Sequence, residues 1–260
     1  PGMSGADLAN LCNEAALMAA RRNARVVEMQ DFEKAKDKIL MGPERKSAVM
    51  DLEELKNTAY HEAGHAIVML NLPKHDPVHK VTIMPRGRAL GLTFFLPEKD
   101  RYSQDKEYML SNIASLFGGR IAEEVFMNQM TTGASNDFER ATSIARDMVM
   151  RFGMSDVMGP MVYADNEGEV FLGRSVTKTT NISEATMQKV DSEVRRIIDE
   201  QYALARKIIE TNRDKVEAIT KALLDWETID RDQLDDIMAG RAPRPPKDFT
   251  PRTPSSGGSG

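Results

Sequence analysis

The feature that most constrains this chain is the pentapeptide His61-Glu62-Ala63-Gly64-His65. Residues four apart lie on one face of an α-helix, so a helix over this stretch lets both imidazoles point at one ion. A catalytic zinc ion takes three protein ligands and keeps a position for water, and a glutamate beside the first histidine can accept a proton from that water. The motif therefore predicts a hydrolytic zinc site with His61 and His65 as ligands and Glu62 as general base.

The surrounding sequence predicts the helix that the motif requires. Asp51 is a candidate cap with an acidic residue three positions on, and Pro73 ends the pattern. Between them the apolar residues recur at helical spacing: Leu52, Leu55, Ala59, Ala63, Ala66, Ile67 and Leu70. The plain alternative is that both histidines are polar residues on an amphipathic helix with no metal. Histidine is scarce in this chain, with four residues in 260, which makes a chance match of the motif improbable.

Composition limits the class of protein. A chain of 260 residues with 41% apolar residues can bury a core for one sizeable domain or a domain with an appendage. The net charge of -5, with no uncompensated cluster of Lys and Arg, disfavours nucleic acid as a partner. Cys12 is the single cysteine, so no internal disulfide forms, and we expect it to be a small buried residue on a helix. No run reaches the roughly 18 to 20 apolar residues that span a bilayer, so we expect this chain itself to be soluble.

The rest of the pattern predicts a mainly α-helical fold with a small β-hairpin or sheet. Helices are predicted over residues 5–22, 30–41, 104–117, 120–126, 184–211, 213–224 and 231–238, with Gly118 and Gly119 joining the third to the fourth. Strands are predicted over 78–84 and 90–96, with a turn at 85–88, and a further short strand over 169–173. The Pro/Ser/Gly-rich tail is expected to be disordered.

The predicted hairpin follows, in the chain, the helix that carries His61 and His65. An edge strand of this kind can bind an extended peptide through backbone hydrogen bonds, which would suit a degradative enzyme. His75 and His79 are also four apart, but Pro77 between them disfavours a regular helix, so we expect surface or loop residues there and not ligands.

The spacing alone leaves the third ligand open. One candidate is Glu123 or Glu124, on a helix downstream of the motif, in the manner of zinc peptidases that use two histidines and a glutamate. The other is Asp137, which the pattern places in the first turn of a helix, where a carboxylate also favours the helix dipole.

Several separate motifs resemble the peptidase domain of the bacterial FtsH proteases. They are the pentapeptide at 61–65 and the stretches 81–91, 118–124, 132–137 and 169–174. That family consists of membrane-anchored, ATP-dependent zinc metalloproteases that assemble as hexamers. The N-terminal stretches 2–8 and 13–16 look like the end of the helical lid of the family's AAA+ ATPase, although read alone they predict only a helical appendage. The resemblance implies a lid remnant over 1–45, a zinc metallopeptidase domain over 46–240 and a tail over 241–260.

The resemblance also implies the roles of the site residues. His61, His65 and Asp137 would bind zinc, one ion per chain, and Glu62 would be the catalytic base. Glu123 and Glu124 would be supporting residues.

At the level of the whole protein, the resemblance implies the endopeptidase part of a processive homo-hexamer that degrades unfolded and membrane proteins at the cytoplasmic face of the bacterial inner membrane. ATP would be used only by the intact protein, because this chain contains no Gly-x-x-x-x-Gly-Lys-Ser/Thr loop. We expect the chain to be a piece of that longer protein. The alternatives are a catalytically silent oligomerisation module of the same assembly and a metal-dependent hydrolase with a non-peptide substrate.

Overall fold

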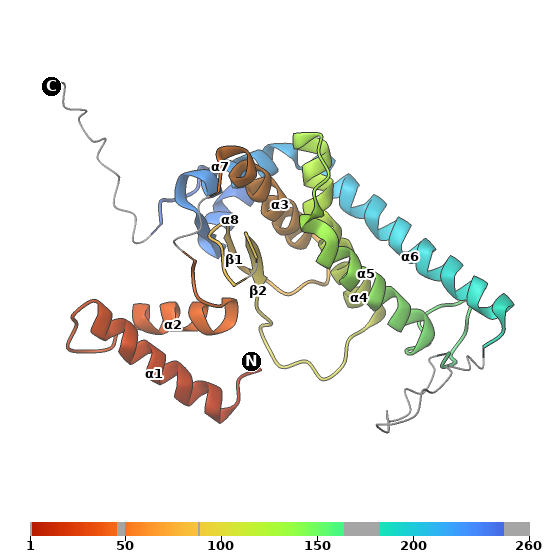
Figure 1. Ribbon diagram of the computed structural model, residues 1–260, viewed down its shortest axis with the longest axis horizontal. Coiled ribbons are helices and arrows are strands. Elements are labelled where there is room, and N and C mark those ends of the chain that lie inside the picture. Colours follow the sequence, from red (N-terminus) through yellow and green to blue (C-terminus); the bar gives the residue numbers. More distant parts are fainter. Residues whose placement is uncertain (1, 46–49, 88, 164–181, 247–260) are drawn as a thin grey trace. The chain divides into compact units, whose positions relative to one another are not determined.

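The computed structural model describes residues 2–45, 50–87, 89–163 and 182–246, and it divides into two compact units (Figure 1). One, which we call the helical unit, comprises Pro1–Gly2, Tyr60–Pro77 and Leu96–Arg213. The other, the sheet unit, comprises Met3–Ala59, Val78–Phe95 and Asp214–Gly260. The strand predicted over 169–173 and most of the predicted tail lie outside the described residues.

The sheet unit contains a three-stranded antiparallel sheet. Strand β1 (Val78–Thr82) lies between β2 (Leu92–Phe95) and β3 (Thr228–Asp230). Val81 pairs with a residue of each neighbour, and its side chain is fully buried. The sequence predicts the hairpin of β1 and β2 but misses β3, a strand of three residues between helices α7 (Arg213–Trp226) and α8 (Arg231–Met238).

Two further helices of the sheet unit, α1 (Gly5–Arg21) and α2 (Met29–Met41), form an antiparallel pair (Figure 1). Ser4 caps α1, because its hydroxyl accepts from the backbone N–H of Asp7 and the Asp7 carboxylate accepts from the backbone N–H of Ser4. The prediction of a buried Cys12 is wrong, since this residue lies on the exposed face of α1. Alanines fill the narrow interface instead: Ala15, Ala19 and Ala35.

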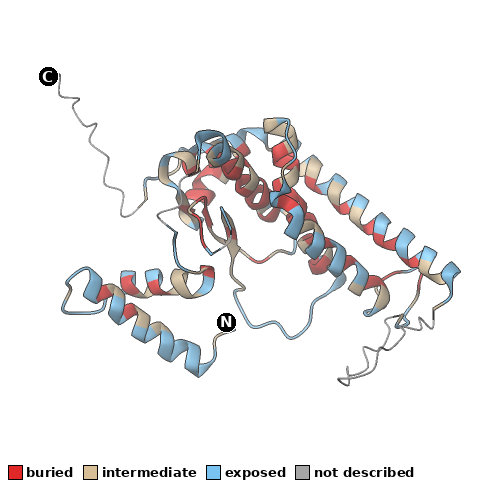
Figure 2. Cartoon of the chain, in the orientation of Figure 1, coloured by how far each residue is buried: buried red, intermediate tan, exposed pale blue. Residues whose placement is uncertain are grey.

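The helical unit consists of the second half of α3 (Leu52–Asn71) together with several later elements. These are the helices α4 (Lys106–Ala122), α5 (Ser135–Met150) and α6 (Glu184–Thr211) and two short turns, the π-helix η1 (Glu123–Met127) and the 3-10 helix η2 (Thr132–Ala134). Helix α4 packs against both α5 and α6. Figure 2 shows the buried residues of these helices concentrated on the faces that meet.

The predicted joint at Gly118-Gly119 is wrong, because α4 continues through both glycines. Their small size serves packing. A Cβ atom on Gly118 would lie 2.5 Å from the backbone oxygen of Gly64 in α3, and one on Gly64 would lie 2.2 Å from the oxygen of Gly118. Helices α3 and α4 therefore cross with their backbones in direct contact, which any larger residue would prevent.

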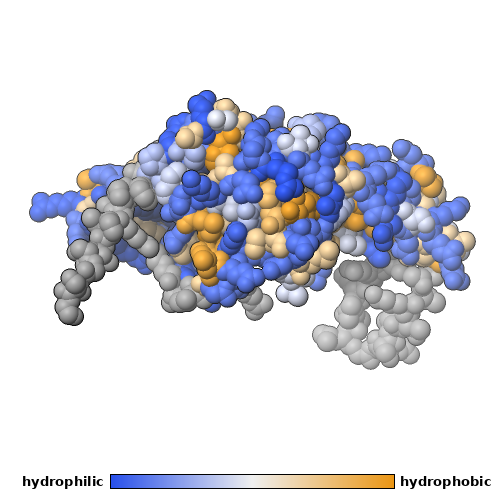
Figure 3. All heavy atoms as spheres, turned by 90° about the horizontal axis from the view of Figure 1, so that it is seen from above, coloured by the Kyte–Doolittle hydropathy of each residue, from blue (hydrophilic) through white to orange (hydrophobic). Residues whose placement is uncertain are grey.

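The predicted fold class, mainly α with a small β-sheet, is confirmed. Figure 3 shows a face on which hydrophilic residues predominate and apolar residues form separate patches. None of the helices in the described part of the chain combines the length and apolar character needed to cross a bilayer.

Replacing Gly118 by alanine should destabilise the protein by about 1 to 3 kcal/mol or more, the usual cost of forcing extra volume into a packed interface. The measurement is the free energy of unfolding in urea, followed by circular dichroism. Gly5→Ala is the matched control, because a Cβ atom at Gly5 in α1 would meet nothing within 4 Å. Equal stability of the Gly118→Ala and Gly5→Ala variants would show that the backbones of α3 and α4 are not in direct contact.

Candidate metal centre

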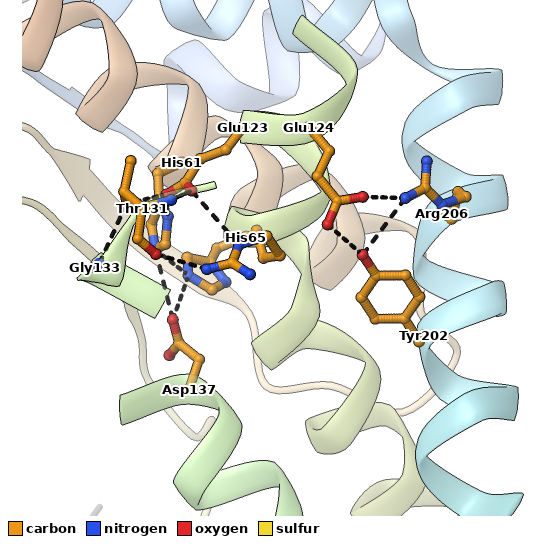
Figure 4. A network of polar contacts seen from close by, with 10 residues as sticks. His61, His65, Glu123, Glu124, Thr131, Gly133, Asp137, Tyr202 and Arg206 are labelled. Carbon is orange, nitrogen blue, oxygen red and sulfur yellow. Dashed lines mark hydrogen bonds and ion pairs between the residues drawn. The ribbon is translucent and has the colours of Figure 1, made fainter. Parts of the chain in front are cut away.

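Three donor atoms from two helices converge in the helical unit (Figure 4). The Nε2 atoms of His61 and His65, both in α3, are 3.0 Å apart. The Oδ2 atom of Asp137, in the first turn of α5, lies 3.5 Å from the Nε2 of His61 and 3.4 Å from that of His65. Among the described residues, these three form the one group of His, Cys, Asp or Glu side chains that could hold a metal ion.

In each histidine the outer ring nitrogen, Nδ1, points away from the three converging donor atoms, and its hydrogen bond decides whether Nε2 presents a lone pair to them. Nδ1 of His65 is 2.8 Å from the backbone oxygen of Ser115, which can only accept, so this nitrogen carries the proton. Nδ1 of His61 likewise donates to the Glu123 carboxylate at 2.7 Å. In the neutral rings both Nε2 atoms then present lone pairs to each other and to the Asp137 oxygen. Three acceptors at this separation repel one another unless a cation lies between them.

The donor set and its spacing fit zinc. Zinc prefers histidine nitrogen and carboxylate oxygen at about 2.0 to 2.2 Å in a tetrahedral arrangement, which places neighbouring donors about 3.3 to 3.6 Å apart. The observed separations of 3.0, 3.4 and 3.5 Å are close to this edge length.

The charges of the site respond to the same contacts. Burial lowers the pKa of His61, but its hydrogen bonds to Asp137 and Glu123 outweigh burial and raise this pKa to about 10. Burial would raise the pKa of Asp137, but its contacts with the His61 and His65 rings hold this pKa well below its usual range. In the metal-free protein a proton on His61 therefore supplies the positive charge, and a metal ion must displace it.

Helix α4 forms the wall behind the histidines. Ser115 contributes the carbonyl that holds His65, and Gly119 leaves room for the other ring, because a Cβ atom there would lie 2.4 Å from two atoms of the His61 imidazole. The absence of a side chain at Gly119 is thus a requirement of the site.

Glu123 is itself held by Thr131 as well as by His61. It is buried, and its carboxylate accepts from the backbone N–H and the hydroxyl of Thr131 at 2.9 and 3.0 Å. Arg120 donates to the backbone oxygen of Thr131 at 2.6 Å. Burial opposes ionisation of Glu123, but the hydrogen bonds from His61 and Thr131 keep its pKa below the ordinary value. The segment that leads to Asp137 is therefore fastened to the carboxylate that orients His61.

Of the two sources considered for the third ligand, the structure brings Asp137 to the inner ring nitrogens. Glu123 contacts the outer nitrogen of His61, and Glu124 contacts Tyr202 and Arg206 of α6. Glu62 is buried in α3 beside His61, outside the converging group.

His75 and His79, predicted to be surface or loop residues, also lie outside the converging group. Both are half-buried, His75 in the loop before β1 and His79 within that strand.

Sequence reasoning missed several residues around the site: Ser115, Gly119, Thr131, Tyr202 and Arg206. Ser115 acts through its backbone, which no side-chain pattern reveals. The paired glycines are visible in the sequence, but such a pair ordinarily indicates a helix break.

A helical His-Glu-x-x-His motif with a carboxylate at the Nε2 atoms of both histidines is the arrangement of a zinc metallopeptidase. This is the class of protein that the fold and the donor set define.

Comparison with known proteins identifies the family. Residues 48–237 match the model of peptidase family M41, and residues 1–34 match that of the AAA+ lid domain. The chain belongs to peptidase family M41. It is 69% identical over 258 residues to the ATP-dependent zinc metalloprotease FtsH of Cupriavidus metallidurans and 58% identical over 244 residues to the protein of the same name from Photobacterium profundum. These alignments cover 99% and 93% of this chain but 39% and 35% of the two relatives.

The Asp137→Ala variant should lose bound zinc, because two ligands from one helix rarely suffice to retain the ion. Zinc content per chain, measured by elemental analysis after desalting, should be about one for the unaltered chain and close to zero for Asp137→Ala. Asp147→Ala is the control, since Asp147 belongs to the same helix but lies outside the converging group, is partly exposed and pairs with Arg151. Full retention of zinc by Asp137→Ala would remove this residue from the site.

Gly119→Ala should weaken zinc binding by about 10- to 100-fold, because the new methyl group displaces the His61 ring. The fold should suffer less, since alanine favours a helix and the obstructed group is a side chain and not backbone. A competition titration with a chromophoric chelator gives the zinc affinity, and unfolding of the metal-free chain gives the stability. An unchanged zinc affinity would contradict the close fit of Gly119 against His61.

Proposed function

We propose that this chain is a zinc endopeptidase, with zinc held by His61, His65 and Asp137, one ion per chain, and Glu62 as general base. The observation that carries the proposal is the convergence of three lone-pair donors within 3.5 Å of one another, with both outer ring nitrogens already occupied. Membership of peptidase family M41 supports the same reaction.

In this mechanism the zinc ion supplies Lewis acidity, which polarises the peptide carbonyl and makes a water molecule acidic near neutral pH. Glu62 accepts a proton from the attacking water and returns one to the leaving amine. His61 and His65 keep Nε2 free for the metal because Glu123 and the carbonyl of Ser115 hold the protons on their Nδ1 atoms. No covalent intermediate with the protein is required.

The longer protein is the second part of the proposal. Residues 1–45 would be the end of an AAA+ lid, 46–240 the peptidase domain and 241–260 a tail, a division supported by the two family matches. We infer that the whole protein is a membrane-anchored homo-hexamer that uses ATP to deliver unfolded and membrane proteins to this site. The name of the relatives supports the dependence on ATP. Within the sheet, β2 is an edge strand whose outer edge would bind an extended substrate by backbone hydrogen bonds.

Glu62→Gln should keep zinc and lose peptide hydrolysis, because an amide of the same shape cannot accept the proton. We expect the rate to fall by at least about 100-fold. The measurement combines zinc content with cleavage of labelled unfolded casein, a substrate that needs no unfolding by an ATPase, and a chelator should stop the reaction of the unaltered chain.

Glu54→Gln, at an exposed acidic position in the first turn of α3, is the control and should cleave normally. Full activity of Glu62→Gln would remove Glu62 from the mechanism. A zinc-loaded chain that cleaves no unfolded substrate would favour a catalytically silent oligomerisation module.

A further inference from the structure

Two adjacent carboxylates at the start of the π-helix η1 serve different partners. Glu123 points to α3 and accepts a hydrogen bond from His61, whereas Glu124 points to α6 (Figure 4). Both side chains are largely withdrawn from solvent, with 1% and 16% exposure. A carboxylate withdrawn from water is costly unless it is hydrogen-bonded or ion-paired, and both Glu123 and Glu124 have such contacts.

Glu124 is fastened by two side chains that lie one turn apart on α6. The hydroxyl of Tyr202 donates to Oε1 of Glu124 at 2.7 Å, and the guanidinium of Arg206 pairs with Oε2. The Tyr202 ring packs edge-on against Phe117 of α4, with ring centroids 5.3 Å apart. Hydrogen bonds to an ionised carboxylate are stronger than those between neutral groups, and the packed aromatic ring fixes the position of the donating hydroxyl.

An aromatic contact also attaches the π-helix η1 to α3. Phe126 stacks on Tyr60, the residue before His61, at 5.0 Å between ring centroids. The guanidinium of Arg213 lies 4.8 Å from the Phe126 ring. Thus η1 lies between α3 and α6 and is held to both, and its rotation about its own axis sets the direction of the Glu123 carboxylate.

We propose that Tyr202 and Arg206 are positioning residues for the zinc ligand His61, acting through Glu124 and the π-helix. By fixing Glu124 they prevent η1 from rotating and keep Glu123 on the Nδ1 atom of His61. This inference rests on the proposed metal site. Partners that orient a metal ligand through its outer nitrogen typically affect metal affinity by about 10- to 100-fold, and we expect about 10-fold for residues one step further away.

The test uses the whole 260-residue chain and the variants Tyr202→Phe and Arg206→Met, with two readouts. The first is the zinc dissociation constant from chelator competition, which should rise by about 10-fold for Arg206→Met and less for Tyr202→Phe. The second is the Nδ1 proton of His61 in nitrogen-15 histidine spectra, which are simple because the chain has four histidines. This resonance should lose its hydrogen-bonded shift in Arg206→Met, and Arg206→Lys should restore part of it.

Matched controls remove similar contacts elsewhere in the helical unit. Tyr108→Phe deletes a hydroxyl that donates to another carboxylate, that of Asp76, at 2.7 Å. Arg195→Met deletes an ion pair with Asp199 on the same helix α6, at 2.8 Å. Both controls should leave the zinc affinity and the His61 resonance unchanged.

The outcomes separate the inference from the proposed function. Lower thermal stability of Arg206→Met with an unchanged zinc dissociation constant and an unchanged His61 resonance would overturn the positioning role and leave a structural clamp. Failure of the unaltered chain to bind zinc would overturn the proposed function. The His61 resonance of the metal-free chain would even then report whether α6 orients this ring.

Discussion

The direct backbone contact between Gly64 and Gly118 is the constraint on which the site depends. It brings α4 close enough to α3 for the Ser115 carbonyl to reach His65 and for the bare backbone at Gly119 to accept the His61 ring. One turn later the π-helix η1, which directly continues α4, brings Glu123 to His61. All the groups that orient the two histidines depend on one crossing of two helices, which explains why a local motif needs a particular tertiary neighbour.

Sequence could predict the local features. The spacing of His61 and His65 is set by helix geometry, and the apolar pattern around them predicts α3 well. The third donor, Asp137, is 72 residues beyond His65, so its approach depends on packing that no spacing rule encodes, and only the family resemblance distinguished it from Glu123 and Glu124. The third strand was missed because three residues carry little pattern. The π-helix was missed because five residues make about one turn, which is too short to distinguish its period from that of an α-helix.

The balance of charge explains how such a site can be buried. Asp137 and Glu123 bring two negative charges next to two neutral rings, and a divalent ion would neutralise both of them. Without the ion, a proton on His61, whose pKa is raised to about 10, offsets part of that charge. The charges of Asp137 and Glu123 are therefore compensated by a proton on His61 or by a metal ion.

The π-helix also limits how the chain length can vary. A π-turn contains one residue more than the α-helical turn that it replaces, and in this chain the π-helix begins at Glu123. Eight residues beyond Glu123, Thr131 returns to bind the same carboxylate. Deleting one residue between them would close the turn as an α-helix and rotate the downstream segment by about 100°. A segment between a helix and a loop usually tolerates insertions and deletions. The length of this segment is constrained, because Thr131 at its end donates two hydrogen bonds to the carboxylate of Glu123 at its start.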